Sequence, residues 1–284
     1  ATPPAVAFDP DRDLGGMMCR NDVNGDACFT RLQLQHVKDF YSGAYDSSGR
    51  IIYPGHTLGS EDQWINLYIP NARNRYRAGA LGVTADHLNY LFYETDPGVA
   101  PRDLNDVSRV PLANATPPEW AWWQFDIDDV TSGKGDFMKA ITDANDPDLS
   151  RMLLEREAKL IMYHGWSDGL IVPGGTVDYY ERMVGATFGG DLDAARERAR
   201  LFMIPGMGHC RGGPGPDTWD RLAPLVEWVE RGNAPDALIA THSTGGVVDN
   251  ERPIFPYPDQ AVYAGPAGGQ NDPANWVAEN FRRR

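Results

Sequence analysis

Two short apolar runs in the second half of the chain carry its clearest secondary-structure signal. They are KLIMYH (159–164) and RLFMIPG (200–206), each compact and apolar enough for a strand buried on both faces. A helix with an apolar face is predicted after each run, over 174–188 and over 217–233. The face of the first helix carries Val177, Tyr180, Met183 and Val184. This alternation predicts an α/β fold, with a parallel sheet covered by helices.

The first half of the chain has a different pattern. Residues 1–30 are acidic and loop-like, and residues 30–45 place apolar side chains close to one helical face, with Thr30 as the N-cap. A turn and a short extended segment follow in 46–56. Residues 60–130 are rich in aromatics with Pro and Gly between them, which favours an irregular or helical cap over a sheet core. These aromatics are Trp64, Tyr68, Tyr76, Tyr90, Phe92, Tyr93, Trp120, Trp122, Trp123 and Phe125.

The texture of the sequence changes at about residue 146, so we predict two domains, 1–145 and 146–284. A chain of 284 residues is long enough to bury a sizeable core. Two parallel strands and their helices do not make a stable sheet, because such sheets need several strands buried on both faces. Residues 1–145 show no comparable strands, so we expect the rest of the sheet to come from polypeptide upstream of this chain.

Net charge and hydropathy limit the partners. The formal net charge of −14 argues against nucleic acid or an anionic membrane as a partner, since both would repel the chain. No apolar run approaches the roughly 20 residues that a membrane span needs, and the first residues do not read as a signal peptide. We nevertheless expect a processed, secreted or periplasmic protein.

The three cysteines support that expectation. Cys19 and Cys28 lie nine residues apart in a polar loop that contains glycine, and we predict a disulfide between them. Cys210 is then unpaired. An odd cysteine in a secreted protein indicates a partner elsewhere, and that partner can lie on another chain.

Two polar residues follow the two predicted strands. Asp168 comes just after the first strand and His209 just after the second. Because functional loops gather at the carboxyl ends of parallel strands, the two side chains are expected to meet. An Asp followed about forty residues later by a His is the second part of the Ser…Asp…His order of α/β-hydrolases. The carboxylate would orient the imidazole, which would take the proton of a serine.

No serine in the chain fits the nucleophile motif G-x-S-x-G. HSTGG (242–246) is the nearest imitation, but His242 replaces the first glycine, no helix follows, and the motif comes after the histidine. DSSGR (46–50) and LGSED (58–62) each lack one of the glycines. The nucleophile is therefore expected outside this chain.

Metal sites are the alternative chemistry. His164, Asp168, His209 and Cys210 offer zinc ligands, yet no C-x-x-C or H-x-x-x-H pair is present. DVNGDA (22–27) mimics part of a calcium loop, but its glycine is misplaced and the distal glutamate is absent. Asn114-Ala115-Thr116 is a lone glycosylation sequon.

Taken together, these motifs resemble the tannase and feruloyl esterase family. The matching stretches are KLIMYHGWSDGLIVPGGTVDYYERM, RLFMIPGMGHCRGGPGPDTWDRLAPLVEWVERGNAPDALIATH and ERPIFPYP. The earlier DACFTRLQLQHVKDFYSG and GRIIYPGHTLGSE are similar to the lid domain of that family. The chain departs from the family pattern at Phe255, where no cysteine stands in RPIFPYP.

The resemblance implies an α/β-hydrolase fold, of which this chain holds the last two strand–helix units after an inserted, aromatic-rich lid at 1–145. It implies Asp168 as the triad acid, His209 as the base and Ile171 at the mouth of the substrate pocket. In the family, a cysteine before the serine is bridged to the cysteine after the histidine, which matches Cys210. The family's structural calcium would bind in a lid loop upstream of residue 1, and this chain itself needs no cofactor.

The resulting hypothesis is a serine esterase that cleaves feruloyl, galloyl or terephthaloyl esters through an acyl-serine intermediate, with the lid aromatics stacking on the acyl ring. Its partners would be the small ester and the N-terminal polypeptide that carries the serine. Two alternatives remain open from the sequence. One is a non-catalytic phenolic- or carbohydrate-binding protein that lacks the nucleophile half, and the other is a metal-dependent hydrolase.

Overall fold

The computed structural model describes residues 8–69, 84, 87–92, 125–269 and 272–284. The chain folds as two compact units, Ala1–His56 and Thr57–Arg284. The predicted domain boundary at residue 145 stays a prediction. Within the described ranges, no helix has both the length and the apolar character that crossing a membrane requires.

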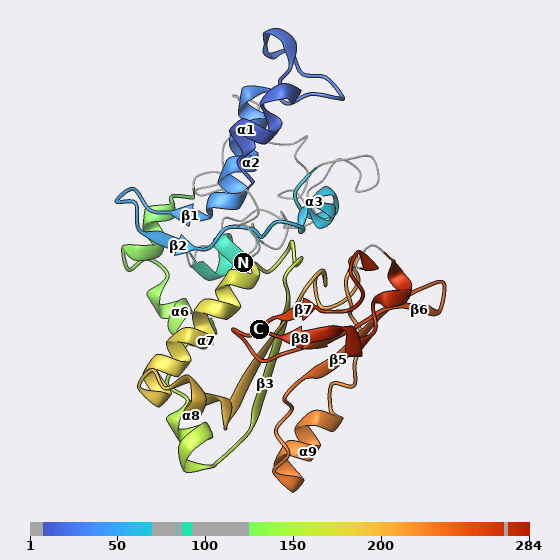
Figure 1. Ribbon diagram of the computed structural model, residues 1–284. Coiled ribbons are helices and arrows are strands. Elements are labelled where there is room, and N and C mark those ends of the chain that lie inside the picture. The colour runs from blue at the N-terminus through green and yellow to red at the C-terminus, as the bar shows by residue number, and fades with distance from the viewer. Residues whose placement is uncertain (1–7, 70–83, 85–86, 93–124, 270–271) are drawn as a thin grey trace. The chain divides into compact units, whose positions relative to one another are not determined.

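The first unit is a small helical element with a two-stranded ribbon (Figure 1). The predicted helix over 30–45 is α2, and its N-cap Thr30 accepts the N–H of Gln33 while the Gln33 side chain accepts the N–H of Thr30. The predicted disulfide between Cys19 and Cys28 is present. The elements are α1 (Pro10–Leu14), η1 (Gly15–Met17), η2 (Arg20–Asp22), α2 (Arg31–Ser42), β1 (Ala44–Tyr45) and β2 (Ile51–Tyr53).

The second unit contains the strands and helices of the predicted α/β region. In chain order its elements are α3 (Glu61–Leu67), η3 (His87–Phe92), η6 (Ile127–Thr131), α6 (Asp136–Thr142), η7 (Arg151–Glu155), β3 (Leu160–Gly165), α7 (Pro173–Phe188), α8 (Leu192–Arg196), β4 (Ala199–Ile204), α9 (Ala223–Arg231), β5 (Leu238–Thr244), β6 (Val247–Ile254), β7 (Ala261–Tyr263), η9 (Pro273–Asn275), η10 (Ala278–Asn280) and β8 (Phe281–Arg283).

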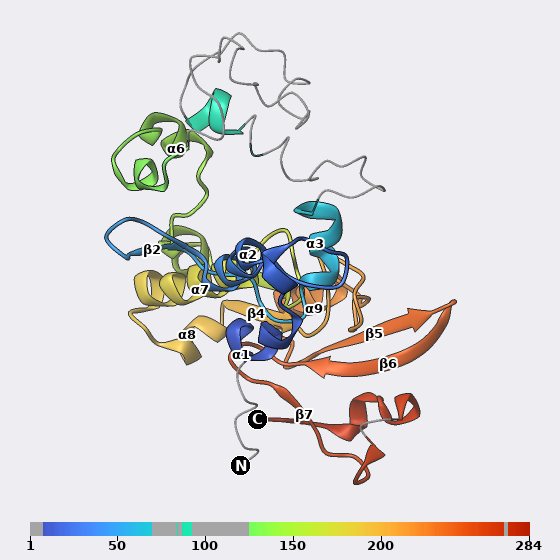
Figure 2. The same ribbon diagram turned by 90° about the horizontal axis from the view of Figure 1, so that it is seen from above.

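Strands β3 and β4 pair in parallel, as predicted, with a register that runs from Leu160 opposite Ala199 to Gly165 opposite Ile204. Every residue of β4 is buried. Leu201 and Met203 pack against α7, whereas Phe202 and Ile204 pack against β5 and β6. Figures 1 and 2 show α7 and the β5–β6 hairpin on opposite sides of these strands. A strand covered on both faces explains why its sequence is a continuous apolar run.

The helix predicted over 217–233 is shorter than expected and begins only at Ala223. The reason is that the preceding residues take part in a β-bridge. The N–H of Thr241 donates to the carbonyl of Thr218 at 2.8 Å, and the N–H of Asp217 donates to the carbonyl of Thr241 at 3.0 Å. This bridge fixes the end of the loop that follows β4.

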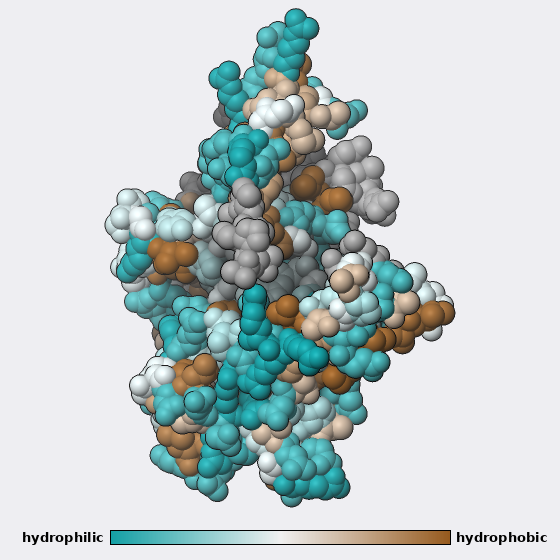
Figure 3. Space-filling model, viewed as in Figure 1, coloured by the Kyte–Doolittle hydropathy of each residue, from teal (hydrophilic) through white to brown (hydrophobic). Residues whose placement is uncertain are grey.

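Residues after 233 form two antiparallel pairs that the apolar pattern did not predict, β5 with β6 and β7 with β8. The β5–β6 hairpin projects beyond the neighbouring elements (Figure 2). Its tip leaves Val247 and Val248 exposed, and apolar colour follows this hairpin on the surface in Figure 3.

The aromatic cap can be followed only in part. Trp64 and Phe92 are buried, and the rings of Phe92 and Phe125 meet edge to face at 6.0 Å, so these aromatics pack with other side chains. The sequon at Asn114 lies outside the described residues. So do Tyr76, Tyr93, Trp120, Trp122 and Trp123, together with the side chain of Tyr90.

Candidate active site

The site lies where β3 and β4 end. Because β3 and β4 are parallel and Gly165 pairs with Ile204, the loops after both strands begin at the same edge. Asp168 lies in the turn after β3 and His209 in the loop after β4. The structure brings them together, with Nδ1 of His209 and Oδ2 of Asp168 3.0 Å apart.

Asp168 is held in place by backbone as well as side-chain donors. Its Oδ1 accepts the N–H groups of Leu170 at 2.8 Å and Ile171 at 2.9 Å. Its side chain is only 3% exposed, against 42% for His209. Backbone N–H groups therefore hold the buried carboxylate in place, while the imidazole is exposed to solvent.

Burial by itself would raise the pKa of Asp168. The hydrogen bonds from His164, from the N–H of Ile171, from His209 and from the N–H of Leu170 outweigh it and lower the pKa to about 2. Asp168 is thus ionised at neutral pH. An ionised carboxylate on Nδ1 is the partner that a histidine base requires.

His164, at the end of β3, is a second imidazole on the same carboxylate. Its Nε2 lies 3.0 Å from Oδ2 of Asp168 and 3.0 Å from the carbonyl oxygen of Ile171. Both neighbours are acceptors, so in the neutral ring Nε2 carries the proton and Nδ1 accepts from the hydroxyl of Thr176 at 2.7 Å. His164 therefore ties the turn 168–171 to helix α7.

In His209 the hydrogen bond to Asp168 places the proton on Nδ1 and leaves Nε2 as the acceptor. Within the described residues, no side chain hydrogen-bonds to Nε2. An exposed, unpaired Nε2 opposite an oriented Nδ1–H is the arrangement of a general base.

The histidine loop lies very close to the end of β3. A Cβ added to Gly165 would lie 2.1 Å from the carbonyl oxygen of Met207, so only glycine allows this approach. The N–H of Ser167 donates to the same carbonyl at 3.0 Å. Farther along the loop, Cys210 has a left-handed backbone (φ 60°), a conformation that residues other than glycine rarely adopt.

The other predicted site residues lie close by. Ile171 is 47% exposed, three residues after Asp168, and its role at a pocket mouth stays a prediction. Cys210 is an exposed free thiol within this chain. Its bond to another polypeptide stays a prediction.

Gln63 of helix α3 had not been expected at the site. Its side-chain oxygen accepts the N–H of Gly169 at 2.8 Å and the N–H of His209 at 3.3 Å. Nothing in the local pattern of the aromatic cap marks this glutamine. His164 had been considered only as a metal ligand, although its position four residues before Asp168 in one turn was a usable signal.

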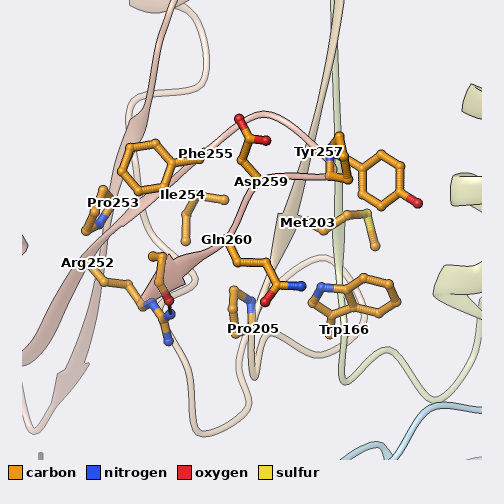
Figure 4. Close-up of a pocket in the computed structure, with 12 residues that line it drawn as sticks. Trp166, Met203, Pro205, Arg252, Pro253, Ile254, Phe255, Tyr257, Asp259 and Gln260 are labelled. Carbon is orange, nitrogen blue, oxygen red and sulfur yellow. Dashed lines mark hydrogen bonds between the residues drawn. The ribbon is translucent and has the colours of Figure 1, made fainter. Parts of the chain in front are cut away.

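A pocket of about 310 Å³ lies beside the site rather than at it, because neither Asp168 nor His209 lines it. It is formed mainly by the end of β6 and the residues after it, together with Trp166 and Met203. In Figure 4, Gln260 lies between Arg252 and Trp166. Trp166, which lines this pocket, precedes Asp168 by two residues in the chain.

The residues weighed as zinc ligands form no cluster in the described part of the chain, where no group of three or more His, Cys, Asp or Glu is placed to hold an ion. His164 and His209 instead direct their nitrogens at one carboxylate oxygen. In the calcium-like loop, Oδ1 of Asp22 accepts the N–H of Arg31 and Oδ1 of Asn24 accepts from Gln33. This loop therefore supports the start of α2, and its residues do not fit a calcium site.

Comparisons with known proteins agree on one family. The sequence model of a family described as tannase and feruloyl esterase matches residues 5–275. A mono(2-hydroxyethyl) terephthalate hydrolase of Piscinibacter sakaiensis is 32% identical over 96% of this chain and 46% of its own length. A probable feruloyl esterase B-1 of Aspergillus flavus is 27% identical over 93% of this chain and 47% of its own length. The chain thus spans about half the length of these relatives.

Solved structures show the same fold. An esterase from Aspergillus oryzae superposes with a TM-score of 0.69 at 24% identity, over 97% of this chain and 51% of its own. Feruloyl esterase B from Aspergillus oryzae also gives 0.69, at 20% identity, over 97% of this chain and 51% of its own.

Proposed function

Since the chain belongs to the tannase and feruloyl esterase family, we propose that it forms the acid–base half of a serine carboxylic ester hydrolase. The observation that carries the proposal is the pair of Asp168 and His209, joined at 3.0 Å between the loops of two adjacent parallel strands. Because Nδ1 of His209 donates to Asp168, Nε2 of the imidazole is free to accept a proton.

The chemistry follows from this geometry. Nε2 of His209 takes the proton of a serine hydroxyl as the serine oxygen attacks the ester carbonyl. The imidazolium, stabilised by Asp168, then gives the proton to the departing alkoxide, so that an alcohol leaves and an acyl-serine remains. Water enters in the same way, and its attack releases the carboxylic acid and restores the serine.

We propose that the serine belongs to polypeptide outside these 284 residues. Support comes from what the candidate serines in the chain do. Ser243 lies in the β5–β6 hairpin, and Gly245 and Gly246 take left-handed conformations that suit a hairpin turn rather than a strand-to-helix elbow. Ser60 is fully buried, donates to the carbonyl of Thr57 and accepts from the indole of Trp64.

The same upstream polypeptide would complete the sheet, because among the described residues β3 pairs with β4 alone. By family likeness, Cys210 would be bridged to the cysteine beside the serine. Residues 1–145 would form the lid over an aromatic acyl group, with Ile171 at the pocket mouth. The Cys19–Cys28 disulfide supports a secreted or periplasmic location. By the same likeness, a structural calcium would bind in a lid loop of the upstream polypeptide.

A serine-directed fluorophosphonate tests the proposal on the full-length protein. Hydrolysis of a feruloyl, galloyl or terephthaloyl ester is expected, with the label mapping to one serine outside these 284 residues. Labelling of a serine within this chain would contradict the location of the nucleophile. Absence of both labelling and hydrolysis would contradict the esterase and favour a binding protein.

A further inference from the structure

Helix α3 lies against the turn that holds Asp168. Thr57 precedes the helix and donates from Oγ1 to the carbonyl of Trp166, and the hydroxyl of Tyr68 reaches the carbonyl of Leu170 at 3.4 Å. These contacts bracket Asp168 on both sides in the sequence. Gln63 lies between these two contacts, on α3 itself.

One oxygen of Gln63 bonds to both loops of the site. Oε1 accepts from the N–H of Gly169, directly after Asp168, and from the N–H of His209 itself. The backbone of His209 and the residue that directly follows Asp168 are thereby tied to the same atom. The His209 side chain is 42% exposed, so packing restrains its ring only in part. The hydrogen bond to its backbone N–H therefore has a larger share in fixing its position.

Both loops also leave room for this side chain. A Cβ on Gly208 would lie 1.9 Å from Nε2 of Gln63, and a Cβ on Gly169 would lie 2.8 Å from Cβ of Gln63. Neither glycine has a left-handed backbone. Space for Gln63, rather than backbone conformation, therefore explains glycine at position 208, where the next nearest atom outside Gln63 is 3.4 Å away.

We propose that Gln63 is a positioning residue that sets the separation of the Asp168 turn and the His209 loop. The proposal rests on the proposed function and adds to it a residue from the cap region that touches neither the ester nor the reacting atoms. A displacement of about 1 Å at such a pair costs roughly a hundredfold in rate. Loss of the double acceptor is therefore expected to act on kcat.

Three variants of the full-length enzyme test this. Gln63→Ala removes the acceptor and is expected to lower kcat between about tenfold and a hundredfold, with KM changed less than about threefold. Gln63→Glu keeps an acceptor of equal reach and is expected to retain most of kcat. Gln35→Ala removes a glutamine whose amide, among the described residues, bonds to Asp39 alone on the exposed face of α2, and is the matched control.

A double-mutant cycle with Gly208→Ala separates positioning from general destabilisation. The added methyl meets only the flexible end of Gln63, so Gly208→Ala is expected to displace that amide and lower kcat by itself. In Gln63→Ala the methyl has nothing to displace, so the double variant is expected to be no slower than Gln63→Ala. Additive losses in the cycle would overturn the proposal, as would wild-type kcat in a folded Gln63→Ala.

A spectroscopic measurement does not depend on turnover. With ¹⁵N-histidine, the proton on Nδ1 of His209 is expected to give a downfield resonance that is assigned by its loss in His209→Ala. This resonance should broaden or vanish in Gln63→Ala and persist in Gln63→Glu and Gln35→Ala. Its persistence in Gln63→Ala would overturn the positioning role even if the wild type proved to have no esterase activity, so the two proposals fail separately.

Discussion

Two histidine–aspartate pairs in the described part of the chain, His209–Asp168 and His242–Asp249, have different surroundings. Nδ1 of His242 lies 2.6 Å from Oδ1 of Asp249, closer than the 3.0 Å between His209 and Asp168. Yet the carboxylate of Asp249 is 35% exposed, whereas that of Asp168 is 3% exposed. A short distance alone therefore does not identify a catalytic pair.

The two pairs are also supported differently. His242 and Asp249 lie on the paired strands of one hairpin, so the hairpin ladder itself holds them. Asp168 and His209 lie on separate loops, and their carboxylate accepts four N–H groups, two from the backbone and two from imidazoles. A buried carboxylate needs several hydrogen-bond donors to offset its loss of hydration. Their convergence at the ends of two parallel strands indicates a catalytic site.

Substitution of the two pairs should show the largest difference. Asp168→Asn and His209→Ala in the full-length enzyme are expected to lower kcat by about 10⁴-fold, because the base loses its orientation or is removed. The equivalent changes Asp249→Asn and His242→Ala are the matched controls and should leave kcat within about twofold. Steady-state kinetics on one aryl ester measures kcat for all four variants. An equal loss in both pairs would contradict the assignment of Asp168 and His209 as the catalytic pair.

His164 is a second imidazole that hydrogen-bonds to Asp168, and its removal is expected to have the next largest effect. His164→Phe deprives Asp168 and the carbonyl of Ile171 of a donor and leaves the hydroxyl of Thr176 without its acceptor. Buried groups left unpaired in this way cost about 3 kcal/mol of unfolding free energy. Urea unfolding measures it.

The exposed His36 of α2 offers the control for this change. His36→Phe is expected to alter the unfolding free energy by less than about 0.5 kcal/mol. If His164→Phe were as mild as His36→Phe, the imidazole of His164 would not be a structural donor to Asp168.

Cys210 adds a further difference, since the hairpin pair has no neighbouring cysteine. A bond from Cys210 to the nucleophile's neighbour would hold the His209 loop, so Cys210→Ser is expected to lower kcat by about a hundredfold with little change in Tm. The double change Cys19→Ser and Cys28→Ser should do the reverse, lowering stability by about 2 kcal/mol and sparing kcat. A free thiol at Cys210 in the full-length protein, found by intact mass with and without reductant, would contradict the bridge.

The sequence predicted the Asp168–His209 pair because both residues follow apolar runs that the parallel register must bring to one edge. It did not predict Gln63, because a helix whose residues lie about a hundred positions away in the chain gives no periodic signal for which loop it will contact. The strands after residue 233 were missed for another reason. The outer faces of β5 and β6 carry exposed residues and their register includes a bulge, so neither a buried run nor a clean alternation appears. Strands β7 and β8 have three residues each, too few to show a pattern.

The smallest of the expected effects concerns acid. The pKa of Asp168 is lowered to about 2 in the folded chain, from an ordinary value of 3.8. As pH falls below about 4, the unfolded chain therefore takes up this proton before the folded chain does. The stabilisation by Asp168 is complete above that pH, amounts to about 2 kcal/mol, and is lost as pH falls through 2.

Urea unfolding at pH 6 and at pH 3 separates the two carboxylates. The wild type should lose more stability between these pH values than Asp168→Asn does, because the amide has no proton to take up. The pKa of Asp249 is also lowered, by hydrogen bonds from Thr244 and His242, but this carboxylate is open to solvent, which screens its interactions. Asp249→Asn should therefore keep nearly the pH dependence of the wild type. If Asp249→Asn flattened that dependence as much as Asp168→Asn, burial would not be what distinguishes the two pairs.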